Sequence, residues 1–266
     1  MRLRNVVAGG LVLILSLATV FAQRGFRGRY EEDNPAEMPA DANEKTEWAF
    51  ARLRYPSGSR SRWRGRGSWS TDYPKADRQF VQGVRRLTRI HTRSNEQVVD
   101  LDLDDNQMFQ WPWIYAVEVG HWDLTDAQCK KIREYLTRGG FLMVDDYHGS
   151  QEWEVFMASM GRIFPDRPIV EIENQDAIFH VLYDLDDRVQ VPGISPLSRG
   201  VTYEQDGIIA HWRGIYDDRG RIMVAMCFNQ DNGDAWEWAD SPHYPEKMAS
   251  QAYRVGINYI IYSMTH

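Results

Sequence analysis

Ionisable side chains follow two apolar runs of the sequence, at the points where these runs end. The runs are Trp113–Val119 and Phe141–Val144, and each reads as a buried strand of a parallel sheet. The first is followed by an imidazole and a carboxylate, and the second by two carboxylates, a phenol and an imidazole: His121, Asp123, Asp145, Asp146, Tyr147 and His148. Because ligands bind beyond the carboxyl ends of parallel strands, we expect these six residues to border a ligand site.

Two further strand ends would add polar groups if their strands run in the same direction. The first strand of the chain ends with Arg52 and Arg54, which complete our candidate ligand-binding residues. A late strand ends in the oxygen-rich run Asn229–Asp234. Carboxylates, imidazoles and a guanidinium would then converge at one edge of the sheet.

These residue types would suit either a metal or a purely structural role. Two histidines with carboxylates are typical ligands of zinc, iron or manganese, and His121, Asp145 and His148 are the candidate metal ligands. In the structural alternative, Asp146 or His148 caps a helix that begins near Ser150. No closely spaced metal motif such as His-Glu-x-x-His is present. We therefore predict no cofactor and leave a divalent metal ion open.

The sequence has no Gly-x-Ser-x-Gly or Gly-x-Cys-x-Gly elbow for a covalent mechanism, and no glycine-rich phosphate fingerprint after a strand.

The loop Arg60–Arg66, which contains Trp63 and is followed by Trp69, could bind an anionic glycan or could be a solvated loop. For Asn229–Ser241 we expect a tight polar loop with its tryptophans packed on the domain. Calcium binding to its oxygen-rich run is the alternative.

Hydrophobic periodicity predicts alternating strands and helices. Thr125 and Gln128 form the pattern of a capping box at the start of a helix that ends at Arg138, so residues 113–146 read as a strand–helix–strand unit. The other expected helices cover residues 76–90, 152–163 and 245–264, with a helical turn at 176–182. The other expected strands cover residues 50–55, 98–101, 169–172, 207–212 and 221–228, the last two joined as a hairpin by Asp217–Gly220. The fold class is α/β, with a mostly parallel central sheet, helices on both faces and a late antiparallel hairpin.

The N-terminus has the pattern of a secretory signal peptide. A basic start, an apolar run and a small residue at its end, Ala22, predict cleavage after that residue, with an uncleaved inner-membrane anchor as the alternative. We expect a disordered linker over residues 23–45 and a single domain over residues 46–266. The expected location is periplasmic or secreted, with membrane contact only through the N-terminal segment if it is not cleaved. Cys129 and Cys227 are expected to be small buried hydrophobes rather than a disulfide.

The net charge of −7 argues against a nucleic-acid partner. Several short pieces resemble a bacterial family of unknown function (domain of unknown function four-one-five-nine). They are Phe50–Pro56, Trp69–Asp72, Trp113–Gly120, Leu136–Asp146, Phe164-Pro165, His180, Arg199-Gly200 and Asp234-x-Trp236. The resemblance implies a flavodoxin-like fold similar to class I glutamine-amidotransferase domains, but it does not imply any particular activity. Active amidotransferases use a Cys nucleophile at a strand–helix elbow, where this sequence has Asp145 and Asp146, so glutaminase activity is not expected.

We leave open whether the chain is an enzyme. Our first hypothesis is a non-catalytic ligand-binding or assembly domain of the bacterial envelope, whose partner is another envelope protein or a glycan. The alternative is a hydrolase, with or without a metal, that acts on a glycan or peptide.

Overall fold

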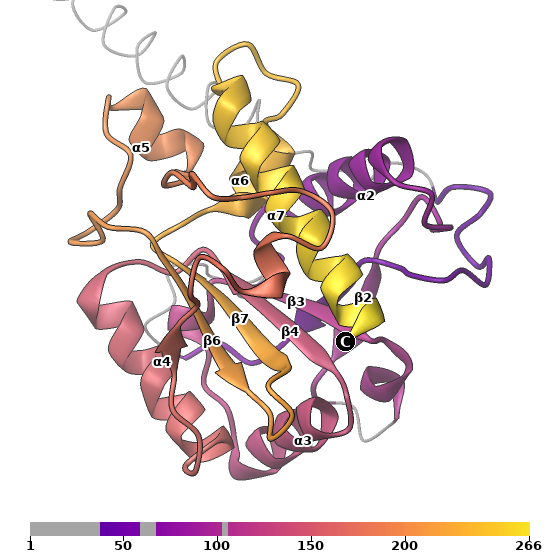
Figure 1. Cartoon of the computed structure of the whole chain (residues 1–266), viewed down its shortest axis with the longest axis vertical. Coiled ribbons are helices and arrows are strands. Elements are labelled where there is room, and N and C mark those ends of the chain that lie inside the picture. The colour runs from indigo at the N-terminus through magenta and orange to yellow at the C-terminus, as the bar shows by residue number, and fades with distance from the viewer. Residues whose placement is uncertain (1–37, 59–67, 103–105) are drawn as a thin grey trace, which may run out of the picture. The chain divides into compact units, whose positions relative to one another are not determined.

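The computed structural model describes residues 38–58, 68–102 and 106–266, and Met38–His266 form one compact unit. A seven-stranded sheet in the order β2-β1-β3-β4-β7-β6-β5 runs through this unit. Figure 1 shows the sheet together with its helices. The strands are β1 (Ala51–Arg54), β2 (Gln97–Asp100), β3 (Trp113–Val117), β4 (Phe141–Asp145), β5 (Val170–Glu171), β6 (His211–Tyr216) and β7 (Ile222–Phe228). Neighbours from β2 to β7 are parallel, whereas β6 is antiparallel to both β7 and β5. The predicted fold class is confirmed.

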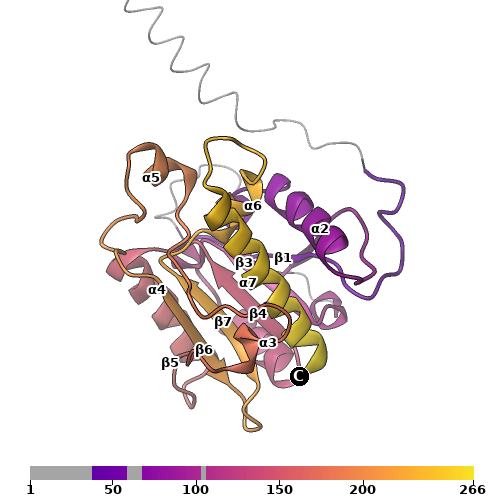
Figure 2. The ribbon, with the colours of Figure 1, turned by 45° about the horizontal axis from the view of Figure 1, so that its top comes forward.

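Helices cover both faces of the sheet (Figure 2). The α-helices are α2 (Lys75–Leu87), α3 (Asp126–Thr137), α4 (Gly149–Ile163), α5 (Ile194–Ser198), α6 (Asn232–Glu237) and α7 (Glu246–Thr265). The short 3-10 helices are η1 (Ser68–Ser70), η2 (Gln107–Gln110), η3 (Val119–His121) and η4 (Ala177–Phe179). Side chains alternate along β3, so Trp113 and Tyr115 pack with α2, α6 and α7, while Ile114 packs with α3 and α4.

The strand–helix–strand unit predicted around α3 is present. β3 and β4 are parallel neighbours, in register from Trp113 opposite Phe141 to Val117 opposite Asp145. The capping box also forms: Gln128 N donates to Thr125 Oγ1 at 3.3 Å, and Thr125 N donates to Gln128 Oε1 at 2.7 Å. The residues at the start of this helix were therefore sufficient to predict where it begins.

Two predicted elements are wrong in detail. The strand expected at 207–212 begins only at His211, because the carbonyls of Gly207 and Ile209 accept hydrogen bonds from the side chains of Gln190 and Asn229 instead of a neighbouring strand. The loop expected at 229–241 contains α6, whose first turn is capped when Asp234 N donates to Asp231 Oδ1 at 2.7 Å. Trp236 is nevertheless packed in the core as expected, with its ring centroid 4.3 Å from that of Phe80.

The end of the predicted linker belongs to the folded unit. Asp41 Oδ2 accepts hydrogen bonds from Ser94 N at 3.0 Å and from Ser94 Oγ at 2.7 Å, and Ala42 is buried. The predicted signal peptide, the linker up to residue 37 and the Arg60–Arg66 loop lie outside the described residues. Within the described ranges, none of the helices is both long and apolar enough to cross a membrane.

The direction in which the chain winds through the sheet changes between β1 and β3. From β1 the chain moves outward to β2, and from β3 it moves the other way to β4 and later β7. In a doubly wound sheet, the crevice at such a switch point is where ligands bind. Tyr55 marks this place: its phenol donates to the carbonyl oxygens of Val117, at 2.5 Å, and Glu118, at 2.9 Å.

Candidate functional site at the carboxyl edge of the sheet

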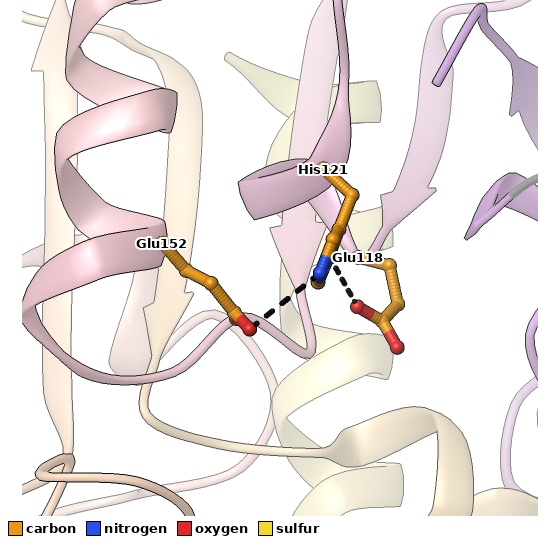
Figure 3. Close-up of side chains that lie close together, drawn as sticks. All are labelled: Glu118, His121 and Glu152. Atoms are coloured by element: carbon orange, nitrogen blue, oxygen red, sulfur yellow. Dashed lines mark ion pairs between the residues drawn. The ribbon is translucent and has the colours of Figure 1, made fainter. Parts of the chain in front are cut away.

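A Glu–His–Glu group lies at the switch point, as Figure 3 shows. Glu118 follows β3 in the left-handed region (φ 54°) and turns the chain into η3, while Glu152 comes from the first turn of α4. His121 Nδ1 is 2.8 Å from Glu118 Oε2, and His121 Nε2 is 3.8 Å from Glu152 Oε1. These three side chains are between 14% and 21% exposed, so a ligand could reach them.

Gly120 allows this group to form. A Cβ atom at residue 120 would lie 2.4 Å from Glu152 Cβ, so any larger residue would push α4 away from η3. Glu152 is also held from both sides, because His148 N donates to its Oε2 at 2.6 Å and Gln205 Nε2 donates to its Oε1.

A second group, which we name the acidic cluster, consists of carboxyl side chains from the loops after β1, β4 and β7 and from α6: Asp72, Asp146, Asp231, Asp234 and Glu237. Carboxylate oxygens of Asp72, Asp146 and Asp231 all lie within 4.8 Å of one another, and so do those of Asp72, Asp234 and Glu237. Asp146 and Asp231 are buried. Asp72 Oδ2 is shielded from solvent and has no hydrogen-bond partner among the described residues.

The acidic cluster has more negative groups than it can easily ionise. Burial raises the pKa of Asp146 well above its usual range, and the charges of Glu118 and Asp72 raise it further. Burial likewise raises the pKa of Asp72, with Asp234 and Glu237 adding repulsion. Removal from water thus makes the largest contribution, and neighbouring carboxylates add to it.

Few positive groups offset these charges. Arg52 lowers the pKa of Asp72 but forms its own buried ion pair with Asp77. Lys75 acts on Glu237, whose pKa is still raised to about 7, chiefly by burial. His148 Nε2 lies 3.0 Å from Asp146 Oδ1, and burial lowers the pKa of this imidazole, which opposes a positive charge on it. A bound cation would supply the missing charge.

Two glycines leave space against the cluster. A Cβ at residue 233 would lie 2.5 Å from Asp72 Oδ2, and one at residue 193 would lie 2.7 Å from Asp231 Oδ2 and 3.0 Å from Asp234 Oδ2. Only a residue without a side chain fits at either position unless the carboxylates move. The donor set, all carboxylate oxygen, is the kind that magnesium, calcium and manganese prefer.

Asp145 has a structural role in this edge. Its carboxylate accepts hydrogen bonds from Tyr115 Oη at 3.0 Å, Asn232 N and Nδ2 at 2.8 Å each, and Gly233 N at 3.1 Å. These bonds lower its pKa, but burial outweighs them and raises it to about 6. Asp145 therefore fastens the start of α6 to the end of β4.

The structure does not gather the three predicted metal ligands into one set. Among the described residues, the groups of three ligand atoms within 4.8 Å include His121 but neither Asp145 nor His148. The physical reason is that Asp145 is already saturated by four hydrogen bonds. His148 pairs with Asp146, and its side chain makes no capping bond to α4. Asn229 Oδ1 and Asp206 Oδ1 instead accept from the first amides of α4, Gly149 N and Ser150 N.

The remaining predicted residues have other surroundings. Tyr147 is fully buried, with ring centroids 4.9 Å from Phe156 and 5.1 Å from Phe228. Arg54 pairs with Asp100, and Asp123 is exposed. Of the candidate ligand residues, Asp146 and His121 thus join the acidic groups of the edge, and His148 contacts Asp146.

Sequence reasoning did not select Glu118, Glu152, Asp72 or Glu237. Asp231 and Asp234 were noted only as part of an oxygen-rich strand end. A signal for Asp72 and Glu118 could not be read from residue type alone, because both owe their position to a left-handed backbone, with φ of 61° and 54°. Asp146, with φ of 52°, shares this feature, so carboxylates turn sharply after two neighbouring strands and in the loop after a third.

A model of the family described as Domain of unknown function (DUF4159) matches residues 49–264. No curated protein matches the chain.

Proposed function

Because the chain belongs to this family of unknown function, we propose its function from the carboxyl edge itself: the domain binds a ligand there, and the acidic cluster holds a divalent cation that takes part in binding. The observation that carries the proposal is the mutual approach of Asp72, Asp146 and Asp231 within 4.8 Å, two of them buried and one with a shielded, unpartnered oxygen. Like charges at this separation are costly unless protons or a cation offset them.

The test is calorimetric titration of manganese and calcium into the chain Gln23–His266. We expect one ion to bind, and Asp146→Asn to weaken it at least about tenfold, because even indirect metal contacts contribute that much. Asp231→Asn should behave alike, since asparagine keeps the acceptor for Asp234 N. Asp123→Asn, which removes an exposed carboxylate near the same edge, is the matched control. Unchanged binding by Asp146→Asn and Asp231→Asn would refute the proposal.

The hydrolase remains a second candidate because of His121. Its imidazole is held between two carboxylates and is 21% exposed, an arrangement in which histidine can act as a general base. Release of products from cell-wall glycans and peptides, with and without manganese, tests this. His121→Gln should abolish such an activity while leaving cation binding to the acidic cluster intact. An inactive wild-type protein that still binds the cation supports the non-catalytic function.

We also propose that the chain is exported to the bacterial envelope, where a glycan or another envelope protein is the partner. The support is the pattern of residues 1–22, with its basic start, apolar run and small final residue. The mass of the protein recovered from the producing cell tests this. A mature chain that begins at Gln23 supports export and cleavage, whereas an intact Met1 in the cytoplasmic fraction contradicts it.

A further inference from the structure

An apolar groove of about 630 Å³ lies at the amino ends of the strands, away from the acidic cluster. Glu47, just before β1, forms part of its wall. The end of α2, the end of α7 and the segment after η4 provide its apolar lining: Leu87, Ile90, Leu182, Ile261 and Met264. The chain end marked C in Figure 1 is the end of α7, whose residues Ile261 and Met264 line the groove.

Large apolar side chains project into solvent at this groove. Leu87 is 51% exposed, Leu182 49% and Met264 40%, although they come from three separate segments of the chain. Single exposed hydrophobic residues are common, but a group of them around one hollow marks an interaction surface.

Two exposed arginines form part of the same groove. Arg86 and Arg89 are exposed in its lining, and neither forms an ion pair with any described residue. The one acidic residue of the lining, Glu47, accepts a hydrogen bond from His91 N at 2.8 Å. The surface therefore combines protruding apolar side chains with free cations, although the whole chain carries a net charge of −7.

We propose that this groove is a membrane-contact surface that binds an anionic phospholipid bilayer, so that membrane contact would not be confined to the N-terminal segment as the sequence predicted. Leu87, Leu182 and Met264 would enter the boundary between headgroups and acyl chains, while Arg86 and Arg89 contact headgroup phosphates. The chain also enters the domain here: Arg85 and Ser94 hold Asp41, and Glu47 follows in the groove wall. The apolar run Val6–Phe21, predicted to direct the chain to a membrane, precedes this entry point in sequence. The positive charges of Arg86 and Arg89 favour an anionic bilayer over an uncharged apolar partner.

The test is co-sedimentation of Gln23–His266 with vesicles of phosphatidylcholine alone or mixed with phosphatidylglycerol. This chain contains the compact unit Met38–His266 and lacks the apolar N-terminal run, so binding would come from the domain. We expect binding to the anionic vesicles that falls at high salt. Arg89→Glu should weaken it more than about fivefold, since removing one cation costs about that factor. The double variant Leu87→Asp, Met264→Asp should abolish it.

Matched controls come from the opposite, carboxyl edge. Ile209→Asp changes a side chain that is 67% exposed but remote from the groove, and Arg199→Glu reverses an exposed charge just after α5. Both should bind vesicles as the wild type does, and thermal unfolding should show all variants folded. Absence of binding, binding to neutral vesicles alone, or equal loss in the controls would overturn the proposal. Because the groove is far from Asp146, the cation-binding variants should keep full vesicle binding, so the two proposals fail independently.

Discussion

Arg52 shows most clearly how single residues hold this edge together. The side chains of Arg52 and Asp77 are both fully buried, and the guanidinium also donates to the carbonyls of Trp69 and Thr71 at 3.0 Å each. We predict that Arg52→Met lowers the free energy of unfolding by about 3–5 kcal/mol, because it leaves the Asp77 carboxylate buried without a partner. Urea unfolding of the variant measures this.

The double variant Arg52→Met, Asp77→Leu is the control for that prediction. It removes both charges, so most of the lost stability should return, although two carbonyls stay without a donor. A double variant as unstable as the single one would mean that the carbonyl contacts, rather than the ion pair, are responsible.

At the scale of elements, Asn229 joins three segments. Gly149 N, at the start of α4, donates to its Oδ1 at 2.9 Å, and its Nδ2 donates to Ile209 O at 2.7 Å. Its own backbone, just after β7, has a φ of 61°. We predict that Asn229→Gly costs about 2 kcal/mol through the two lost hydrogen bonds. Asn229→Ala should cost about 1 kcal/mol more, because alanine also resists the left-handed backbone.

Thermal and urea unfolding of both Asn229 variants test this ordering. Hydrogen exchange would locate the lost stability, which we expect in the first turn of α4 and in the loop at residues 207–209. If glycine were the more disruptive substitution, backbone strain at this position would not matter.

The elements predicted correctly are those specified by local sequence. The helix after Thr125 has its cap and apolar face within one stretch, and the run from Phe141 is apolar enough to read as a buried strand. The start of α6 was missed because Asp231, Asn232 and Gly233 read as turn residues. Asp145, from a strand far away in sequence, stabilises that helix start. The Glu–His–Glu group depends on the same kind of distant contact, because Glu118 and Glu152 come together only when α4 packs on η3.

For the whole molecule, the acidic cluster predicts an unusual dependence of stability on pH. Asp72, Asp146 and Asp231 have folded-state pKa values above those of the unfolded chain. Their contribution to stability is therefore complete below pH of about 4 and is lost as the pH rises through the folded-state pKa values. In EDTA, we expect the free energy of unfolding attributable to the cluster to fall as the pH rises toward neutrality.

Asp146→Asn isolates this contribution, because asparagine cannot ionise and the repulsion with Asp72 disappears. The variant should gain stability relative to the wild type as the pH rises in EDTA, and saturating manganese should reduce that advantage because it stabilises the wild type more than the variant. A constant difference between the two proteins across the pH range would show that these carboxyls do not titrate as the structure indicates.

The two cysteines show how completely the sheet divides the molecule. Cys129, on α3, packs in the core on one face, while Cys227, on β7, packs in the core on the other face, next to α7. A disulfide would have to pass through the sheet, so oxidation cannot join them in the folded chain. Burial raises the pKa of both thiols, which further lowers their reactivity.

We therefore predict that a thiol reagent labels neither cysteine quickly in the native protein and labels both in urea. We also expect the melting temperature to be the same with and without a reductant. Fast labelling of Cys227 alone would instead show that α7 separates readily from the sheet.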